Sequence, residues 1–182
     1  MLFTTHEFII FFIIVLTVIA IVKRGLFHHI FLLGASYFFF YFSSNYLVTL
    51  LIFSTLLDFY IGKAIFSAKS KKIKKILLLS SLVGNLGLLG FFKYIDFGIL
   101  QINQLTNTLG FSEIPALELI LPIGISFYTF QTISYVVDIY RGKLTPSKSL
   151  VEFALFVSFF PQLVAGPILR ASEFLPQLRE KV

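Results

Sequence analysis

Four polar side chains recur along one apolar stretch at a spacing that places them on a single helical face. Tyr128, Gln131, Tyr135 and Asp138 follow one another at intervals of three, four and three residues within segment 117–140. At about 100° per residue, these positions fall within an arc of roughly 80°. Polar groups in an apolar span face protein or a hydrated cavity rather than lipid. We therefore expect the stripe to line a cavity in which a substrate is bound or passed along; hydrogen bonding between helices is the alternative.

The next apolar stretch carries helix-breaking residues. Pro161 and Pro167 each lack a backbone donor, and Gly166 directly before Pro167 continues a helix poorly. A broken helix at membrane depth survives only where it is buried in protein or lines a cavity. Two further candidate site residues lie at and just beyond this break, Gln162 and Arg170. Arg170 could bind a phosphate or carboxylate, or could simply anchor the chain at the interface.

The two ends of the stripe-bearing span have their own signals. Pro122 lies at its start, where a missing backbone donor is tolerated, and Gly124 permits close helix contact. At the other end, Asp138 and Arg141 are one turn apart and are expected to form an ion pair that fixes the end of the helix.

The composition is that of a membrane protein. Of 182 residues, 57% are hydrophobic and only 13% charged, and the mean hydropathy is +0.91. A soluble domain of this length needs far more polar surface. The chain has no cysteine, which excludes disulfides, thiolate metal sites and a cysteine nucleophile. Its three histidines are divided between two segments, His6 in one and the pair His28–His29 in another, so we expect no metal site.

The apolar segments predict an all-α fold, a polytopic transmembrane bundle with about six hydrophobic segments. One of these is interrupted or re-entrant, and residues 1–182 form a single transmembrane unit without an internal repeat. A short surface helix over 95–109 is expected between the fourth and fifth segments, followed by a loop over 107–113. The segments are 2–22, 26–42, 46–61, 76–92, 117–140 and 150–168.

Basic residues collect in alternate connections, which predicts the orientation. The connections 23–29, 62–75 and 141–149 carry eleven basic residues, whereas the other connections carry one, Lys93. The positive-inside rule places the first group in the cytoplasm and the amino terminus outside it, in a bacterial cytoplasmic membrane. The net charge of +6 is thereby explained without a nucleic-acid partner. The lysines of 69–75 either anchor the chain or bind cytosolic partners or anionic lipid.

The remaining ionisable residues have plainer interpretations. Asp58 lies late in the third segment, near Lys63, and is expected to reach the cytosolic interface. His28 and His29 are expected at the same interface, beside Lys23 and Arg24.

Three stretches resemble the membrane-bound O-acyltransferase family, in particular its bacterial branch that acetylates alginate. They are NLGLLGFFKY at 85–94, LPIGISFYTFQTISYVVDIYRG at 121–142 and FFPQLVAGPILRASEFLPQL at 159–178. The resemblance implies transfer of an acyl group, most simply acetyl, from a cytosolic donor such as acetyl-coenzyme A or an acyl carrier protein, with no bound cofactor. The implied acceptor is a hydroxyl of an extracytoplasmic polysaccharide or cell-wall polymer, and the implied partners are the bilayer and an extracytoplasmic acyltransferase.

The chain departs from the family pattern at one decisive point. The resemblance implies a membrane-embedded catalytic histidine on a later helix, but this chain has no histidine after His29. It therefore resembles the amino-terminal part of a longer enzyme, and we expect it to be inactive alone. The alternatives are a small transporter, against which the missing inverted repeat counts, and a non-catalytic membrane scaffold.

Overall fold

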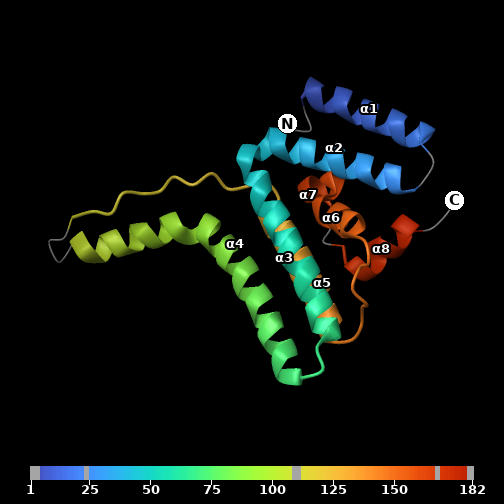
Figure 1. The fold of residues 1–182 in the computed structure, drawn as a ribbon. Helices are drawn as coiled ribbons and strands as arrows, with labels where there is room; N and C mark the ends of the chain where they lie inside the picture. Colours follow the sequence, from blue (N-terminus) through green and yellow to red (C-terminus); the bar gives the residue numbers. More distant parts are fainter. Residues whose placement is uncertain (1–4, 23–24, 108–111, 167–168, 180–182) are drawn as a thin grey trace.

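The computed structural model describes residues 5–22, 25–107, 112–166 and 169–179, and every regular element in these ranges is a helix (Figure 1). The all-α prediction is therefore confirmed. In chain order the helices are α1 (His6–Ile21), α2 (Leu26–Ser44), the short 3₁₀ turn η1 (Asn45–Leu47), α3 (Val48–Ser67), α4 (Lys71–Asn107), α5 (Ile125–Tyr140), α6 (Leu150–Ser158), α7 (Phe160–Ala165) and α8 (Ala171–Arg179).

Helices α3, α4 and α5 pack together, and α2 and α6 close one side of this group (Figure 1). The main core is rich in large aromatic and branched side chains. At its centre the ring of Tyr135 on α5 lies 4.3 Å from that of Phe153 on α6. A second cluster joins α1 and α2 to the break between α6 and α7 through Phe39 and Phe160, whose ring centroids are 5.5 Å apart. α5 is thus covered by its neighbours on all but one face, where Phe130 is exposed.

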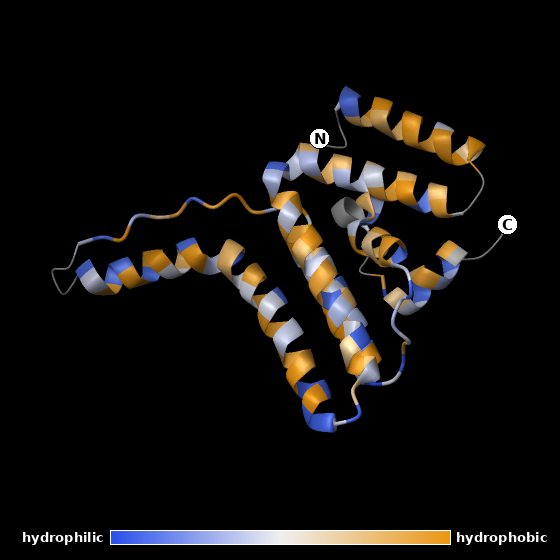
Figure 2. Ribbon diagram, viewed as in Figure 1, coloured by the Kyte–Doolittle hydropathy of each residue, from blue (hydrophilic) through white to orange (hydrophobic). Residues whose placement is uncertain are grey.

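Two long helical stretches among the described residues are apolar enough to cross a membrane. They are Leu26–Ser67, which runs through α2, η1 and α3, and Lys71–Asn107; shorter apolar helices cover His6–Ile21 and Leu150–Gln162. Apolar residues cover much of α1 and α2, whereas the lysine-rich connection of α3 and α4 is strongly hydrophilic (Figure 2). The number of spans, six, stays a prediction.

The region before α5 differs from the sequence-based prediction in two respects. The expected fourth segment and the surface helix after it form one continuous helix of 37 residues, α4. The expected fifth segment begins eight residues late, because α5 starts only at Ile125 and 112–121 is extended. Gly124 precedes α5 with φ of +73°, a left-handed conformation that favours glycine. Its role is therefore the turn into the helix, and the carbonyl of Pro122 accepts a hydrogen bond from the Ile125 N–H at 3.3 Å.

The sixth segment is interrupted, as predicted. α6 ends at Ser158, and Pro161 lies in the first turn of α7, where proline is tolerated. The Phe160 N–H at the break donates to the Ser36 hydroxyl of α2 at 3.4 Å. The break is thus buried in protein, and α7 ends at Gly166, whose N–H donates to the Gln162 carbonyl at 3.0 Å. Pro167 lies outside the described residues, and re-entrance stays a prediction.

Candidate functional site

Three members of the polar stripe on α5 lie inside the bundle. Tyr128, Gln131 and Tyr135 are buried, whereas Asp138 is half-buried. Along a helix that rises 1.5 Å per residue, the buried three cover about 10 Å. Tyr128 meets Phe40 of α2 edge to face, with ring centroids 6.3 Å apart. The stripe therefore faces α2 at Tyr128, and α3 and α6 at Tyr135.

Tyr135 is held at both ends of its side chain. Its ring packs on Phe153, and its hydroxyl accepts a hydrogen bond from the Ser147 N–H at 3.0 Å. The ring also lies so close to α3 that a Cβ added at Gly62 would be 2.9 Å from Cε1 of Tyr135. Tyr135 consequently fixes the spacing of α3, α5 and the loop before α6.

Gln131 is the stripe residue with unused hydrogen-bonding capacity. Its side chain is 1% exposed, and its Oε1 accepts no hydrogen bond from any described residue. A buried amide oxygen without a donor costs about 1–3 kcal/mol. Such a group is suited to accept a hydrogen bond from an O–H or N–H that enters the bundle.

The end of α5 next to Asp138 is closed by backbone contacts. The Asp138 carbonyl accepts hydrogen bonds from the N–H groups of Lys143 at 2.9 Å and Leu144 at 3.3 Å. Arg141 is exposed at the helix end, and its ion pair with Asp138 stays a prediction.

A buried polar network lies beside the stripe, at Thr132 of α5, and the sequence interpretation missed it. Asp58 was expected at the cytosolic interface, but its side chain is 0% exposed. One carboxylate oxygen accepts from the Ser81 hydroxyl at 2.6 Å, and the other accepts from Nδ2 of Asn85 at 2.8 Å. The ammonium group of Lys63 lies over the ring of Phe59, 4.0 Å from its centroid, rather than beside the Asp58 carboxylate.

Asn85 connects this carboxylate to the other helices. Its Oδ1 accepts from the Ser54 hydroxyl of α3 at 2.5 Å and from the Thr132 hydroxyl of α5 at 3.4 Å. We call Ser54, Asp58, Ser81, Asn85 and Thr132 the Asp58 network; all five are at most 1% exposed. The available signal was spacing, since Ser54 and Asp58, like Ser81 and Asn85, are four residues apart and share a helical face.

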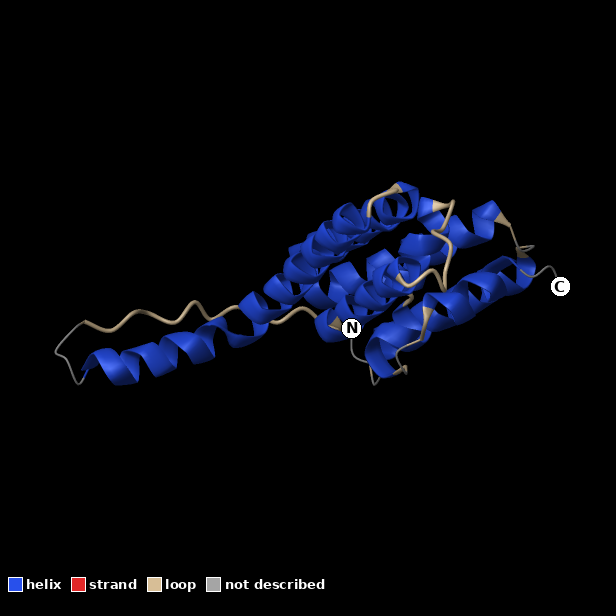
Figure 3. Cartoon of the chain, turned by 90° about the horizontal axis from the view of Figure 1, so that it is seen from below, coloured by secondary structure: helices blue, strands red, loops and turns tan. Residues whose placement is uncertain are grey.

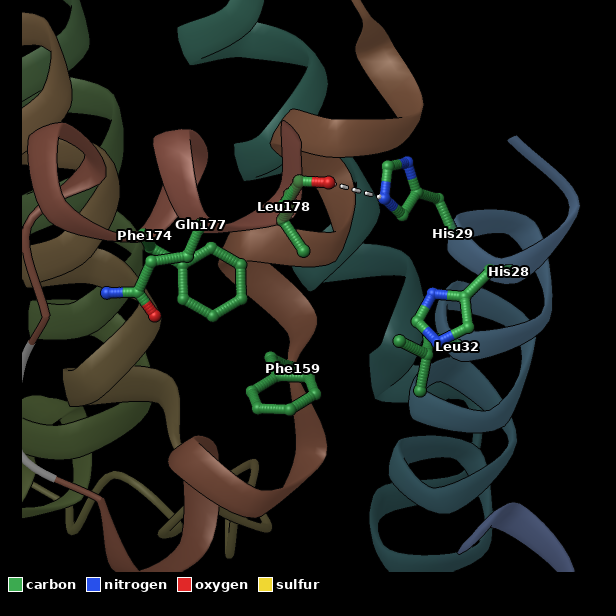
Figure 4. Close-up of a pocket in the computed structure, with 7 residues that line it drawn as sticks. All are labelled: His28, His29, Leu32, Phe159, Phe174, Gln177 and Leu178. Carbon is green, nitrogen blue, oxygen red and sulfur yellow. Dashed lines mark hydrogen bonds between the residues drawn. The ribbon is translucent and has the colours of Figure 1, made fainter. Parts of the chain in front are cut away.

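The two histidines of α2 line a cleft. The cleft has a volume of about 420 Å³ and lies between α2, α8 and the α6–α7 break (Figure 4). His29 Nε2 lies 3.1 Å from the Leu178 carbonyl and donates to it, while Phe159 and Phe174 form an aromatic wall. Both imidazoles are buried, and their position at the membrane interface stays a prediction.

The two candidates from the broken helix are separated by the structure. Gln162 on α7 is buried, whereas Arg170 is exposed just before α8. The Arg170 carbonyl accepts hydrogen bonds from the N–H groups of Glu173 and Phe174 at 3.0 and 3.1 Å. No group of three or more histidine, aspartate or glutamate side chains in the described ranges could hold a metal ion.

Basic residues from two connections gather at one end of the bundle. Lys63 and Lys148 line one depression with 145–147, and Tyr140 lines another with Lys69, Lys71 and Lys74. The end of α5 that carries Asp138 thus lies beside both lysine-rich connections.

Comparison with known proteins shows that the chain is similar in sequence to bacterial O-acetylases. A Pseudomonas aeruginosa protein named "Probable alginate O-acetylase AlgI" is 38% identical over 136 residues, which cover 72% of this chain and 26% of that protein. A Pseudomonas putida protein of the same name is 39% identical over 129 residues, or 70% and 26%. The chain is a homologue of these O-acetylases. The resemblance to the membrane-bound O-acyltransferase family is thereby confirmed.

A relative with lower sequence identity has a name that refers to a different polymer, peptidoglycan. The "Peptidoglycan O-acetyltransferase" of Helicobacter pylori is 35% identical over 156 residues, covering 72% of this chain and 29% of that protein. The chain therefore spans between a quarter and a third of the length of the curated O-acetylase relatives it matches. No protein-family model matches the chain. No solved structure matches it either.

Proposed function

We propose that the chain is the amino-terminal part of a membrane O-acyltransferase that moves an acetyl group from a cytosolic donor to hydroxyls of an extracytoplasmic polymer. The names of the homologues support acetyl transfer to alginate or peptidoglycan. The main support for a path through the helix bundle, along which the acetyl group would pass, is the buried polar face of α5. It runs from the turn at Gly124 toward Asp138, at the end where the lysine-rich connections gather.

The orientation follows from charge. Placing the lysine-rich end in the cytoplasm puts the amino terminus and the 108–122 connection outside, in a bacterial cytoplasmic membrane. The donor, acetyl-coenzyme A or an acyl carrier protein, then approaches Asp138 and Arg141, while the polymer and an extracytoplasmic acyltransferase partner lie beyond Gly124. The catalytic histidine belongs to the rest of the proposed longer enzyme.

The purified 182-residue chain is expected to transfer no acetyl group. A general base must reach the acceptor hydroxyl with a pKa suited to its proton, and the family resemblance places that histidine outside this chain. The measurement is transfer of radiolabelled acetyl from acetyl-coenzyme A to alginate and peptidoglycan fragments in reconstituted vesicles. A full-length relative serves as the positive control, and turnover by the purified chain would refute the expectation.

In the proposed longer protein, Gln131→Leu and Asp138→Leu are each expected to lower acetyl transfer about tenfold at unchanged membrane levels. Loss of one hydrogen bond of about 1.4 kcal/mol in the transition state gives this factor. Polymer acetylation and membrane-fraction immunoblots measure the two quantities. Phe130→Leu on the exposed face of α5 is the matched control. Unchanged acetylation in both stripe variants would reduce the stripe to packing between helices.

A further inference from the structure

Helix α4 is too long to be accommodated as an upright span. Its 37 residues extend about 55 Å at 1.5 Å per residue, whereas the hydrocarbon core of a bilayer is about 30 Å thick. Its first part packs on α3 and α5, and its last part turns away and projects beyond the bundle (Figures 1 and 3). The projecting part must therefore leave the membrane, or lie along its surface.

The projecting part is a two-layered arm, which we define as residues 93–107 of α4 and the extended segment 112–121. Asp96 accepts hydrogen bonds from the N–H groups of Leu117 at 2.8 Å and Leu119 at 3.3 Å. Asn103 both donates to the Ile114 carbonyl at 2.8 Å and accepts from its N–H at 2.9 Å. These side chains satisfy backbone groups that an extended segment in lipid could not leave unpaired.

The helical face opposite Asp96 and Asn103 is exposed and mainly apolar, with Gln101 as a polar residue within it. Taking 100° per residue, Tyr94, Phe97, Ile102 and Leu105 lie within roughly 140°, centred opposite Asp96 and Asn103. Phe97 is 61% exposed and Leu105 69%. The extended segment, on the other side of the arm, carries exposed apolar side chains of its own, Ile114, Leu117, Ile120 and Leu121. An exposed apolar face of the extent found on α4 indicates an occupant.

The exposed face continues without a break along the rest of α4. Ile76, Leu79, Val83 and Leu86 are all exposed and project within the same sector as Tyr94. The sector that meets lipid along the spanning part of α4 is thus the sector left bare on the arm. Tyr94 and Lys93 at the junction are residue types that prefer the membrane interface.

We propose that the arm lies in the extracytoplasmic leaflet, with the apolar face of residues 93–107 among the acyl chains. The extended segment 112–121, which is hydrogen-bonded to Asp96 and Asn103, lies on the opposite side of the helix. The occupant of the face is lipid, because the face continues the lipid-facing sector of α4. Within 93–107 the only charged side chains are Lys93 and Asp96, and neither is in that apolar sector. The inference depends on the helical face and the charge-based orientation, and not on the proposed acyl transfer.

The absence of cysteine makes the test direct. Leu105→Cys, on the apolar face, and Asn107→Cys, exposed about 160° away on the side of Asp96 and Asn103, are labelled with an environment-sensitive fluorophore in reconstituted vesicles. We expect the label at Leu105 to emit at shorter wavelength and to be quenched by spin-labelled lipid. The label at Asn107 should be quenched by aqueous iodide.

Two outcomes would overturn the proposal. Iodide quenching of both labels would place the arm in water. Protection of the Leu105 label from both quenchers would show that protein, such as a second copy of the chain, covers the face. Ile102→Cys repeats the test at a second position on the apolar face, and far-UV circular dichroism checks that each variant retains its helices.

Discussion

Asp58→Ala is expected to lower the free energy of unfolding of the helix bundle by about 2–5 kcal/mol. The substitution removes the acceptor of the Ser81 hydroxyl and one acceptor of Asn85 Nδ2, which are both buried. Each buried donor that loses its acceptor costs about 1–3 kcal/mol, and the missing side chain adds a cavity. Denaturation of the detergent-solubilised chain with sodium dodecyl sulfate, followed by circular dichroism, measures the difference.

Two carboxylate variants provide the controls. Asp58→Asn keeps the volume and one acceptor oxygen, so its loss of stability should be intermediate. Asp138→Asn alters a half-buried carboxylate on α5 and should change the free energy of unfolding by less than about 0.5 kcal/mol. If Asp58→Ala has the same free energy of unfolding as the parent chain, the Asp58 network does not hold α3, α4 and α5 together.

Asp58 also shows why sequence reasoning reached only part of the site. Its position late in a span, five residues before Lys63, suits a side chain that reaches the interface. Its burial depends on the register of α3 against α4, which brings Ser81 and Asn85 to it from 23 and 27 residues away. Local spacing carries no information about that register. The stripe on α5 could be predicted, because its four members share one helical face.

The fold was predictable where apolar periodicity alone decides the element. The runs around α2, α3 and α5 became helices, and Pro161 correctly marked an interruption. The sequence predicted two helices where α4 is one, because the fall in hydropathy after residue 92 was taken for the end of a helix. The start of α5 was misplaced because the apolar run 117–121 is held extended by Asp96, a tertiary contact that apolarity does not reveal.

The stripe on α5 and the adjoining Asp58 network differ in how fully their hydrogen-bonding groups are satisfied. Within the Asp58 network, the carboxylate oxygens of Asp58 and Oδ1 of Asn85 all have donors. The stripe instead retains an acceptor without a donor at Gln131. A satisfied network stabilises one packing of helices, whereas an unsatisfied buried group is suited to a transient partner. The division favours a structural role for the Asp58 network and a substrate-facing role for Gln131.

Gly62→Val is expected to destabilise the contact between α3 and α5 by about 1–3 kcal/mol, the range for overpacking a tight core. A Cβ at Gly62 would lie 2.9 Å from Cε1 of Tyr135 and 2.9 Å from Cδ1 of Ile139. The Ile139 methyl can rotate away. Tyr135 cannot, because Phe153 holds its ring and the Ser147 N–H its hydroxyl. The same denaturation experiment measures the loss.

Gly87→Val on α4 is the matched control, since no atom lies within 4 Å of a Cβ added there. It should remain within about 0.5 kcal/mol of the parent. Equal losses in the two variants would attribute the effect to valine in a helix rather than to crowding. Combining Ile139→Val with Gly62→Val separates the two contacts, because valine at 139 lacks the Cδ1 atom that would lie 2.9 Å from the new Cβ. If the Tyr135 ring is the rigid obstacle, Ile139→Val will restore only part of the stability lost in Gly62→Val; full restoration would identify Ile139 as the obstacle.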